Sequence, residues 1–343
     1  MTPKLLTLTI LILFFVPVSG QTNFRVMFYN VENLFDTIDD PEKDDNDFLP
    51  DGIMHWTPGR YRNKLNNIAK IITSAGEWDT PALVGLCEVE NEKVVNDLTQ
   101  FSPLKKMNYR FVMTDSPDPR GIDVALLYQR DKFKYLEHNS YTIKFPHNPD
   151  RLTRNILHVS GQVSAQDTLD VFVCHFPSRR GGEKESEPDR EYVASVVKAK
   201  SDSLMQIRKN AYIVIMGDFN DEPSNKSIFQ ILNAQPISKD LSDNGLYNLF
   251  YHFEKRKNTG SYKFQTQWNM LDQIIVSGNL IKGIGSVWVF PNTAIIFYRE
   301  YMLTDDKTNA GKRPKKTFHG RKYEGGYSDH LPVIVDFMIK NDY

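Results

Sequence analysis

Short apolar runs recur along the whole chain, separated by polar segments that are rich in turn-forming residues. Runs of about four to eight residues dominated by Val, Ile, Phe and Tyr are typical of buried β-strands. This pattern predicts strands at residues 25–30, 82–88, 110–114, 123–128, 156–160, 170–175, 212–217, 272–276 and 333–338.

Two segments instead repeat their apolar residues at helical spacing. The first follows Pro58 and contains Tyr61, Leu65, Ile68 and Ile72. The second follows Pro188 and contains Tyr192, Val196, Val197, Leu204 and Ile207. Strands and helices therefore alternate loosely, while several strands follow one another directly, which favours antiparallel pairing. We expect an α/β protein with two stacked β-sheets and helices on the outer faces.

The chain shows no Ser/Gly-rich linker, no break in composition and no internal repeat after its first twenty residues. Its 343 residues would make about two domains of average size, but layered enzymes can exceed that size as one unit. We therefore predict a single domain over residues 21–343.

The N-terminal segment has a different pattern. Lys4 precedes an apolar run from Leu5 to Val16, and Val18-Ser19-Gly20 follows as a small-residue cleavage site. A helix of this length rises only about 18 Å, short of the roughly 30 Å bilayer core. We predict a signal peptide at residues 1–20 and an extracytoplasmic protein, secreted or periplasmic, with no stable membrane span after cleavage. An uncleaved anchor is the alternative.

The charge balance excludes one class of function. The chain has 42 Lys and Arg against 43 Asp and Glu, so it is not a protein that coats itself in positive charge to hold a polyanion. Hydrophobic residues make up 40% of it, which excludes an intrinsically disordered chain. Cys87 and Cys174 each lie in an apolar run, so we expect two buried thiols, with a disulfide bond as the alternative.

Two charged segments interrupt the pattern. Residues 36–51 are acidic, but counted from Asp45, Leu49 stands where a calcium loop of the EF-hand type needs an oxygen ligand and Pro50 where it needs Gly, so we expect a solvated loop. Residues 307–322 hold seven Lys and Arg and lead into Tyr327-Ser328-Asp329-His330. This second segment is the best candidate for a local phosphate-facing patch.

Several apolar runs end in a polar residue of a catalytic type, namely Asn30, Glu88, His175, and Asp218 with Asn220. One such residue could simply cap a strand, but several at carboxyl ends of strands are expected to converge on one rim of the sandwich. Asn and carboxylate oxygens are hard ligands, suited to Mg²⁺, Mn²⁺ or Ca²⁺ rather than to zinc.

A thiolate metal site and two other hydrolase types are not expected. Cys87 and Cys174 precede Glu88 and His175 by one residue, so strand alternation would place each thiol on the opposite face from the polar side chain. The chain contains neither a G-x-S-x-G elbow nor a G-x-x-x-x-G-K-[ST] loop, so the signatures of serine hydrolases and nucleoside triphosphatases are missing.

The same residues lie in a recognisable order of motifs. These are YNVEN with Asn30, GLCEVEN with Glu88, CHFPS with His175, GDFND with Asp218 and Asn220, LDQIIVS with Asp272, and SDHLPV with Asp329 and His330. The sequence resembles the endonuclease/exonuclease/phosphatase superfamily, which includes deoxyribonucleases, abasic-site endonucleases, inositol phosphatases and sphingomyelinases. The resemblance covers nearly the whole chain after residue 20. It implies a four-layered α/β sandwich and metal-dependent hydrolysis of phosphate esters by in-line attack of water.

The resemblance also implies roles for individual residues. Glu88 would be the principal ligand of Mg²⁺ (or Mn²⁺ or Ca²⁺), with Asn30 and Asp329. Asp218 would orient or deprotonate the attacking water, and Asn220 would donate a hydrogen bond to the phosphate. His330 would contact the phosphate, with Asp272 fixing its tautomer.

Further residues follow from the resemblance and from charge. His175 would pair with a carboxylate on an earlier strand, for which Asp123 lies at the matching place, although an Asp that begins a strand commonly caps a turn. Arg154 and Arg120 are candidate phosphate contacts through their planar guanidinium groups. Lys315 and Lys316 of the basic segment are candidate substrate-binding residues.

We therefore predict an exported, metal-dependent phosphodiesterase, most simply a nuclease with a nucleic acid or other phosphodiester as its substrate. A lipid or inositol phosphate phosphoesterase of the same superfamily is the first alternative. A non-catalytic binding module is the second, although the expected site positions carry competent residue types. We expect a monomer.

Overall fold

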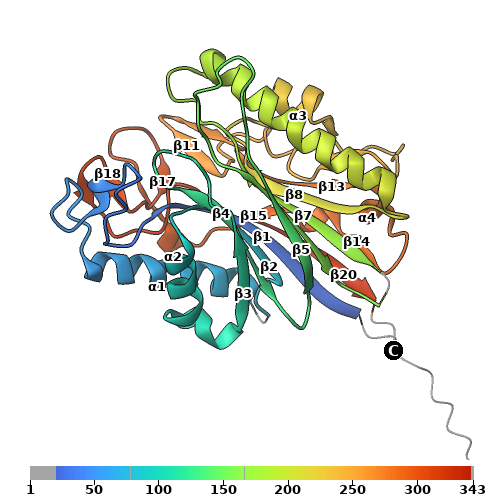
Figure 1. Ribbon diagram of the computed structural model, residues 1–343, viewed down its shortest axis with the longest axis horizontal. Coiled ribbons are helices and arrows are strands. Elements are labelled where there is room, and N and C mark those ends of the chain that lie inside the picture. The colour runs from blue at the N-terminus through green and yellow to red at the C-terminus, as the bar shows by residue number, and fades with distance from the viewer. Residues whose placement is uncertain (1–20, 78, 166, 341–343) are drawn as a thin grey trace, which may run out of the picture.

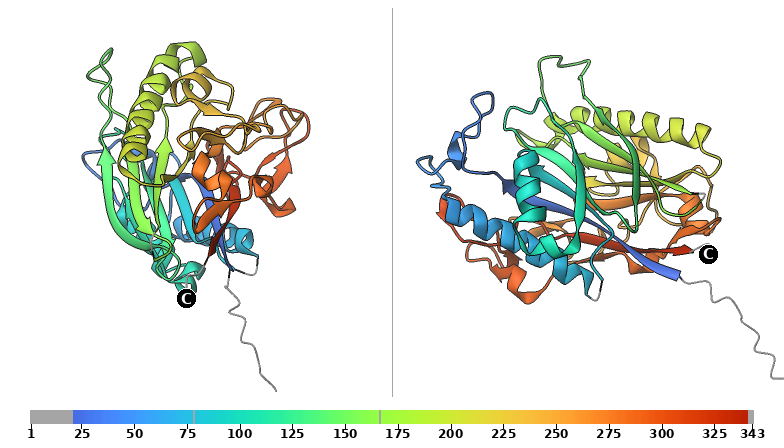
Figure 2. Two further views of the ribbon diagram at one scale, coloured as in Figure 1. Left: turned by 90° about the vertical axis from the view of Figure 1, so that its right-hand side faces the viewer. Right: turned by 60° about the horizontal axis from the view of Figure 1, so that its bottom comes forward.

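Two seven-stranded β-sheets pack face to face at the centre of the molecule, and helices cover both outer faces (Figures 1 and 2). The computed structural model describes residues 21–77, 79–165 and 167–340. The predicted signal peptide at residues 1–20 lies outside these described residues. The helix–sheet–sheet–helix layering confirms the predicted four-layered α/β sandwich.

The strand order of each sheet mixes segments from distant parts of the chain. The first sheet runs β14 (Val287–Val289), β20 (Val333–Lys340), β1 (Gln21–Leu34), β2 (Leu83–Val89), β4 (Asp123–Gln129) and β3 (Tyr109–Met113), and β15 (Ile295–Ile296) also pairs with β20. The second runs β5 (Lys134–Tyr141), β6 (Ile156–Gln162), β7 (Thr168–His175), β8 (Tyr212–Asp218), β13 (Asp272–Ser277), β10 (Leu246–Asn248) and β9 (Ala234–Gln235).

Helices and small hairpins complete the fold. The helices are α1 (Pro58–Gly76), α2 (Glu92–Gln100), α3 (Glu183–Ile207) and α4 (Gly278–Lys282). Short helical turns lie at Asn46–Phe48, Pro103–Met107, Ser227–Ile231, Pro291–Thr293 and Glu300–Met302. Three two-stranded hairpins are β11 (Tyr262–Phe264) with β12 (Gln267–Asn269), β16 (Leu303–Asp305) with β17 (Lys312–Pro314), and β18 (Phe318–His319) with β19 (Lys322–Tyr323).

Local sequence explains where α1 and α2 begin and which faces of α1 and α3 are buried. Thr57 caps α1 by accepting a hydrogen bond from the Arg60 amide, and Pro58 occupies the first helical position, where its missing N–H costs nothing. Asn91 caps α2 in the same way through the Val94 amide. The apolar residues of α1 cover the first sheet, and those of α3 cover the second.

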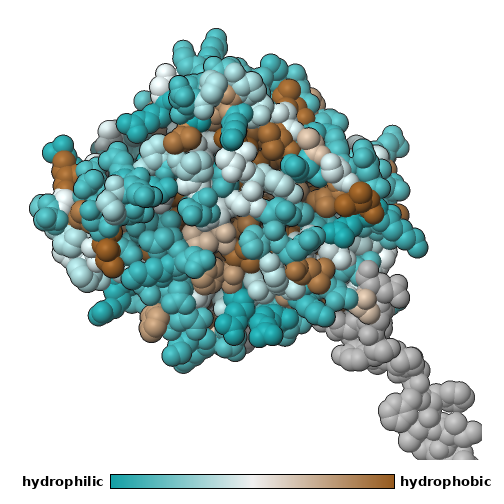
Figure 3. All heavy atoms as spheres, in the orientation of Figure 1, coloured by the Kyte–Doolittle hydropathy of each residue, from teal (hydrophilic) through white to brown (hydrophobic). Residues whose placement is uncertain are grey.

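Strand alternation divides the apolar residues among three cores. Val26 and Phe28 of β1 belong to the core between the two sheets, whereas Met27 and Tyr29 belong to the core beneath α1. The sheets approach closely at Gly85 of β2, where an added Cβ would lie 2.8 Å from the sulfur of Met216. The outer surface seen in Figure 3 is mostly hydrophilic, with separate small hydrophobic patches.

Each sheet contains a parallel pair of strands at its centre. In the first sheet β1 is parallel to β2, and in the second β7 is parallel to β8, while the neighbours of both pairs are antiparallel. Parallel strands place their carboxyl ends at the same edge of a sheet. The two pairs therefore bring the ends of four strands to one rim of the sandwich.

All nine predicted strands are present, with ends shifted by a few residues. The eight-residue strand β5 was not predicted, because seven of its residues are exposed and it therefore has no apolar alternation. Helix α3 begins at Glu183 and includes Pro188, so the predicted start after Pro188 was wrong. Both cysteines are free and buried, which confirms the predicted thiols.

The two charged segments differ in structure. The acidic segment at residues 36–51 is mostly an exposed or half-buried loop, as predicted, although Asp36 and Asp45 are only 4% and 2% exposed. The basic segment at residues 307–322 contains β17 and β18 and begins β19, at the end of the molecule labelled by β17 and β18 in Figure 1. In the described part of the chain, none of the helices combines the length and the apolar character that crossing a bilayer requires.

Candidate active site

Four polar side chains meet where the central parallel strands end. Asn30 lies on β1, Glu88 on β2, His175 on β7 and Asp218 on β8. The Asn30 amide nitrogen lies 3.3 Å from Glu88 Oε1 and donates a 3.0 Å hydrogen bond to Asp218 Oδ2. His175 Nε2 lies 3.9 Å from Glu88 Oε1 and 3.7 Å from Asp218 Oδ2. The sequence prediction that these strand ends converge on one rim therefore agrees with the geometry.

A backbone irregularity turns Glu88 into this cluster. The β2–β4 pairing shifts register between Cys87 and Val89, and Glu88 has a φ of 62°, in the left-handed region that non-glycine residues rarely adopt. The Asn33 amide then donates a 2.9 Å hydrogen bond to Glu88 Oε2. Strained residues of this kind concentrate at functional sites, where the surrounding structure compensates for their cost.

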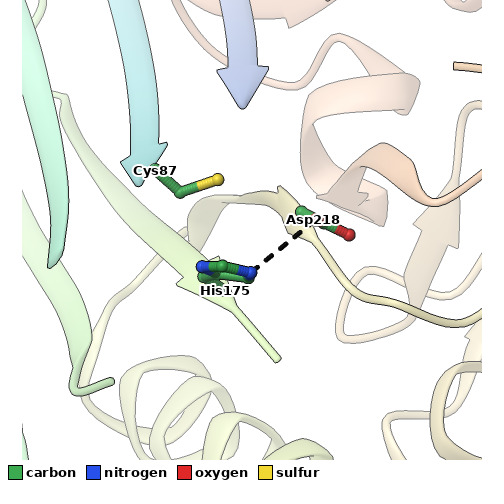
Figure 4. A group of neighbouring side chains, drawn as sticks. All are labelled: Cys87, His175 and Asp218. Atoms are coloured by element: carbon green, nitrogen blue, oxygen red, sulfur yellow. Dashed lines mark ion pairs between the residues drawn. The ribbon is translucent and has the colours of Figure 1, made fainter. Parts of the chain in front are cut away.

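The same irregularity overturns one expectation about the thiols. Cys174 packs beneath α3, on the opposite face from His175, as alternation predicts. Cys87, however, faces the core between the sheets, and its sulfur lies within 4.8 Å of ligand atoms of His175 and Asp218 (Figure 4). Burial, together with the charges of Asp218 and Glu88, raises the pKa of Cys87 well above its usual value, which favours the neutral thiol over the thiolate.

A histidine and a carboxylate from two other segments complete the cluster. His330 Nδ1 lies 2.6 Å from Asp272 Oδ2, and His330 Nε2 lies 3.8 Å from Asp218 Oδ2. Asp272 begins β13, whose first residue is paired with Asp218 of β8. The predicted Asp272–His330 pair is therefore formed, with the other imidazole nitrogen directed toward Asp218.

Burial and mutual charge shift the ionisation of these groups. Burial raises the pKa of Asp218 to about 7; the charge of His330 opposes the shift and that of Asp272 adds to it. Burial lowers the pKa of His330, but the negative charges of Asp272 and Asp218 outweigh it, so the net shift is well upward. For His175, burial and the positive charge of Arg154 lower the pKa well below its usual value, so its imidazole is neutral.

The predicted pairing of Asp123 with His175 is not found. The Asp123 carboxylate accepts hydrogen bonds from the side chains of Thr114 and Ser116 and from the Ser116 amide. His175 Nδ1 is buried and has no hydrogen-bond partner. Asp123 therefore organises the turn before β4, which is the ordinary role of an Asp that begins a strand.

The two predicted arginines differ in their surroundings. Arg154 is 6% exposed; it donates a 2.5 Å hydrogen bond to the Phe176 carbonyl and forms a 3.2 Å ion pair with Asp118. Asn220 donates to the same carbonyl at 3.1 Å, so Arg154 lies beside the GDFND loop. Arg120 is more exposed and contacts the other oxygen of Asp118 at 3.4 Å.

The predicted residues of the basic segment lie beside the motif that carries His330. Lys315 and Lys316 are half-buried, and their carbonyls accept hydrogen bonds from the amides of Tyr327 and Gly326. Asp329 is also half-buried, and its negative charge contributes to the raised pKa of Glu32. Asp329 is thus close to the cluster at the end of β1.

Sequence reasoning missed three residues of the site. Glu32 is 8% exposed, Lys64 of α1 is 1% exposed, and the Tyr262 ring lies over the His330 imidazole with centroids 4.7 Å apart. Glu32 could have been found two residues after Asn30, and Lys64 as a charged residue inside the apolar stripe of Tyr61, Leu65 and Ile68. Nothing in the sequence near Tyr262 indicates its contact with His330.

The donor set fits a hard divalent cation. Glu88 offers carboxylate oxygens at the rim, and Asp329 lies nearby. The Asn30 side chain directs its amide nitrogen to Glu88, and its Oδ1 accepts a hydrogen bond from the Glu32 amide. Burial also raises the pKa of Glu32 to about 7, and the negative charge of Asp329 adds to this shift. Such a concentration of carboxylates in a poorly solvated place is relieved by a cation, and oxygen ligands suit Mg²⁺, Mn²⁺ or Ca²⁺.

A second group of potential ligands is better explained by hydrogen bonding. Ligand atoms of Asp218, Asp272 and His330 lie within 4.8 Å of one another. The short Asp272–His330 contact already occupies Nδ1 of the imidazole, and carboxylate–histidine pairing of this kind orients the ring for proton transfer. The Asn30 and Glu88 side of the cluster is therefore the candidate place for a divalent cation.

Fold and site together define a phosphoester hydrolase of the two-sheet type. The model of the Endonuclease/Exonuclease/phosphatase family matches residues 25–339, and the chain belongs to this family. Members of the family are metal-dependent phosphoester hydrolases, so the protein is an enzyme of the phosphodiesterase or phosphatase type. A search of curated proteins finds no match.

Solved structures share the fold at low sequence identity. An endonuclease/exonuclease/phosphatase family protein from Bacteroides thetaiotaomicron is 16% identical, with a TM-score of 0.57 over 94% of this chain and 97% of that one. TDP2 from D. rerio, complexed with single strand DNA product, is 15% identical, with a TM-score of 0.54 over 92% and 99%. The human Nocturnin catalytic domain, with bound sulfate anion, is 15% identical, with a TM-score of 0.54 over 93% and 97%.

Proposed function

We propose that this protein is an exported phosphodiesterase that cleaves nucleic acid with the help of a divalent cation, Mg²⁺ in the first instance or Mn²⁺ or Ca²⁺. The observation that carries the proposal is the convergence of Asn30, Glu88, Asp218 and His330 where two parallel strand pairs end. The bound cation would polarise the phosphate ester and stabilise the charge that develops on its oxygens. Asn30, Glu88 and Asp329 would hold it.

The remaining residues would move the proton and hold the phosphate. Asp218, with its raised pKa of about 7, would accept a proton from water as the water oxygen attacks phosphorus in line. The bond to the leaving oxygen then breaks on the opposite side of phosphorus. His330, held by Asp272, would donate a hydrogen bond to the phosphate, and Asn220 would do the same.

Nucleic acid is the proposed substrate because several basic residues belong to segments that adjoin the site. Arg154 and Arg120 both lower the pKa of His175 through their positive charges, and Lys315 and Lys316 belong to the segment that leads into Asp329 and His330. Such side chains neutralise successive phosphates along a strand. The DNA product complex of TDP2, a protein of the same fold, adds support by analogy.

A membrane-acting phosphoesterase is the second candidate. Phe290, Ile295 and Tyr298 are 42%, 44% and 52% exposed within one short stretch of chain. Exposed aromatic and aliphatic side chains of this kind suit a lipid interface. This candidate predicts hydrolysis of sphingomyelin or inositol phosphates that depends on a lipid surface and weakly on salt.

The deciding experiment offers several substrates to purified residues 21–343. Plasmid DNA, single-stranded DNA, RNA, sphingomyelin vesicles and inositol phosphates are each incubated with Mg²⁺, Mn²⁺ or Ca²⁺. We expect hydrolysis of nucleic acid that stops in excess EDTA and is lost in Asp218→Ala and His330→Ala. Activity that survives EDTA, or full activity in either variant, would refute the mechanism.

Salt dependence tests the role of the basic segment. If nucleic acid is the substrate, the double change of Lys315 and Lys316 to Gln should flatten the logarithmic salt dependence of binding by about one unit per lost phosphate contact. Lys132→Gln, on the loop between β4 and β5, is the control for charge. An unchanged slope in the double variant removes this segment from the binding surface.

Export and oligomeric state are proposals with direct tests. The full chain expressed in bacteria should yield a mature N-terminus at Gln21 in the extracytoplasmic fraction, whereas an intact Met1 on the mature protein contradicts export by signal cleavage. Size-exclusion chromatography with light scattering should give the mass of a monomer.

A further inference from the structure

Lys64 is a buried lysine in the middle of α1. Its side chain is 1% exposed and lies among the apolar residues that cover the first sheet. Moving an ammonium group out of water is costly unless its donors are hydrogen-bonded and its charge is paired. The contacts that meet this requirement all belong to segments of the candidate site.

Three groups surround the Lys64 ammonium. It donates a 2.5 Å hydrogen bond to Thr317 Oγ1 and a 2.8 Å hydrogen bond to the Tyr327 carbonyl. Its third neighbour is Glu32 Oε2, at 3.7 Å. The same Glu32 oxygen accepts a 2.7 Å hydrogen bond from the Thr317 amide. Lys64 and Glu32 therefore both contact Thr317 as well as each other.

Other residues of α1 hold the same segment. The Asn67 amide donates to the carbonyls of Gly325 and Gly326 at 3.2 and 2.7 Å. Lys70 donates to the Tyr327 hydroxyl at 3.3 Å. Lys64, Asn67 and Lys70 follow one another at three-residue spacing, so they share one face of α1.

The held segment leads directly into the catalytic cluster. Ser328 donates a 2.7 Å hydrogen bond to the Asn30 carbonyl and accepts a 3.0 Å hydrogen bond from the His330 amide. The Glu32 amide in turn donates to Asn30 Oδ1 at 3.0 Å. Residues 317–330 are thus tied at one end to Lys64 and Glu32, and at the other end to Asn30.

We propose that the Lys64–Glu32 pair is a positioning device that fixes residues 317–330 against the end of β1 and so sets Asp329 and His330 relative to Asn30. The proposal rests on the proposed function, because it assigns a consequence to that site. A displacement of about 1 Å in a catalytic group can lower a rate about 100-fold, so anchoring of this kind has a large effect on turnover.

A purely structural role makes a different prediction. If the pair only filled space beneath the basic segment, its replacement by apolar side chains would change stability and leave turnover unchanged, since buried ion pairs can often be exchanged for apolar residues at little cost. Turnover and local order therefore separate the two roles.

The kinetic test uses the full mature chain and four variants. Lys64→Met keeps the length of the side chain and removes its charge, and we expect kcat to fall at least tenfold with KM changed less than threefold. Glu32→Gln keeps an acceptor for the Thr317 amide, so we expect its kcat to fall less than that of Lys64→Met. The double variant should equal Lys64→Met alone, because both changes remove one unit. Arg62→Met, an exposed residue of the same helix, is the control and should stay within twofold.

A second measurement does not depend on activity. Amide hydrogen exchange of the substrate-free protein should be at least tenfold faster at Thr317, Tyr327 and His330 in Lys64→Met than in Arg62→Met, with β1 unchanged. If the wild-type protein hydrolyses no phosphoester, the proposed function fails. The exchange measurement then still tests whether the Lys64–Glu32 pair anchors residues 317–330. Should Lys64→Met fail to fold, the double variant, which buries no unpaired charge, replaces it.

Two outcomes overturn the proposal. Unchanged exchange in Lys64→Met means that the pair does not hold the segment. Faster exchange or lower stability with wild-type kcat means that the pair is structural and does not position the catalytic residues.

Discussion

At the scale of single residues, the short contact between Asp272 and His330 makes the clearest prediction. Asp272→Asn removes the negative charge that orients the imidazole and favours its protonated form, so we expect kcat to fall by about 100-fold or more. The measurement is steady-state kinetics on the substrate that the screen described under Proposed function identifies. Asp305→Asn, the same change on an exposed residue of β16, is the control. Turnover in Asp272→Asn within threefold of wild type contradicts the assigned role.

Cys87 makes the opposite prediction. Its thiol lies beside His175 and Asp218, but its raised pKa keeps it protonated, so Cys87→Ala should retain kcat within threefold. The free energy of unfolding should fall by about 1–2 kcal/mol, because a small cavity is left in the core between the sheets. Chemical denaturation and kinetics on the same preparation test both statements. A loss of metal affinity in this variant would instead make the sulfur a ligand.

The sequence predicted some of these site residues and not others. The motifs located Asn30, Glu88, Asp218 and His330, because strand ends and residue types are both visible in the sequence. They could not place Cys87, because alternation fails where the chain bulges at Glu88. The expected partner of His175 was wrong because Thr114 and Ser116, which engage Asp123, belong to a turn whose geometry no local pattern specifies.

At the scale of elements, a buried polar cluster joins α3 to the second sheet. Asp170 of β7 lies 3.0 Å from His158 Nε2 of β6, accepts a 2.5 Å hydrogen bond from Ser160, and forms a 3.1 Å ion pair with Arg208, which follows α3. Burial raises the pKa of the Asp170 carboxyl, but the hydrogen bonds from His158, Arg208 and Ser160 outweigh this effect and hold the pKa below its usual value.

The depressed pKa gives a stability prediction with a definite sign. Because the folded protein holds Asp170 ionised more firmly than the unfolded chain does, its contribution is complete above about pH 5 and is lost as the pH falls through the folded pKa. Asp170→Asn should therefore have a lower free energy of unfolding than the wild-type protein at pH 7. Between pH 5 and pH 3 its free energy of unfolding should fall by less than that of the wild-type protein.

Urea denaturation at a series of pH values gives the measurement. Asp202→Asn, on the exposed side of α3, is the control and should keep the wild-type profile. An Asp170→Asn profile parallel to that of wild type, offset by a constant, would mean that the carboxylate does not titrate as described.

Elements differed in how much the sequence revealed about them. Strands buried on both faces, such as β8, are continuous apolar runs and were predicted within a residue of their observed ends. The edge strand β5 pairs only with β6 and is almost wholly exposed, so its sequence KYLEHNSY has no reason to alternate. The first turns of α3 bury the polar residues Ser186, Asp189 and Arg190, so a search for apolar spacing does not detect them.

At the scale of the whole molecule, the site joins the two sheets. Glu88 comes from the first sheet and Asp218 from the second, and both carboxylates lie within 3.3 Å of the Asn30 amide nitrogen. A cation that binds only the folded protein stabilises it, by about 2.7 kcal/mol at 100 times its dissociation constant. Thermal denaturation of the wild-type protein should therefore show a higher Tm with Mg²⁺ or Mn²⁺ than with EDTA.

Glu88→Gln should lose most of this shift, while Glu77→Gln, an exposed residue at the end of α1, should keep it. A wild-type Tm that is the same in EDTA and in saturating metal would contradict a cation site between the sheets.

The pairing of β1 with β20 has a consequence for how the chain acquires this structure. Val26 is paired with Val335 and Phe28 with Val333, so the strand that carries Asn30 obtains one of its two neighbours from the last strand of the described chain. Contacts between segments so distant in sequence form late and slowly. The first sheet cannot close on a nascent chain that still lacks β20, so during synthesis β1 remains without this partner until residues 333–340 have emerged.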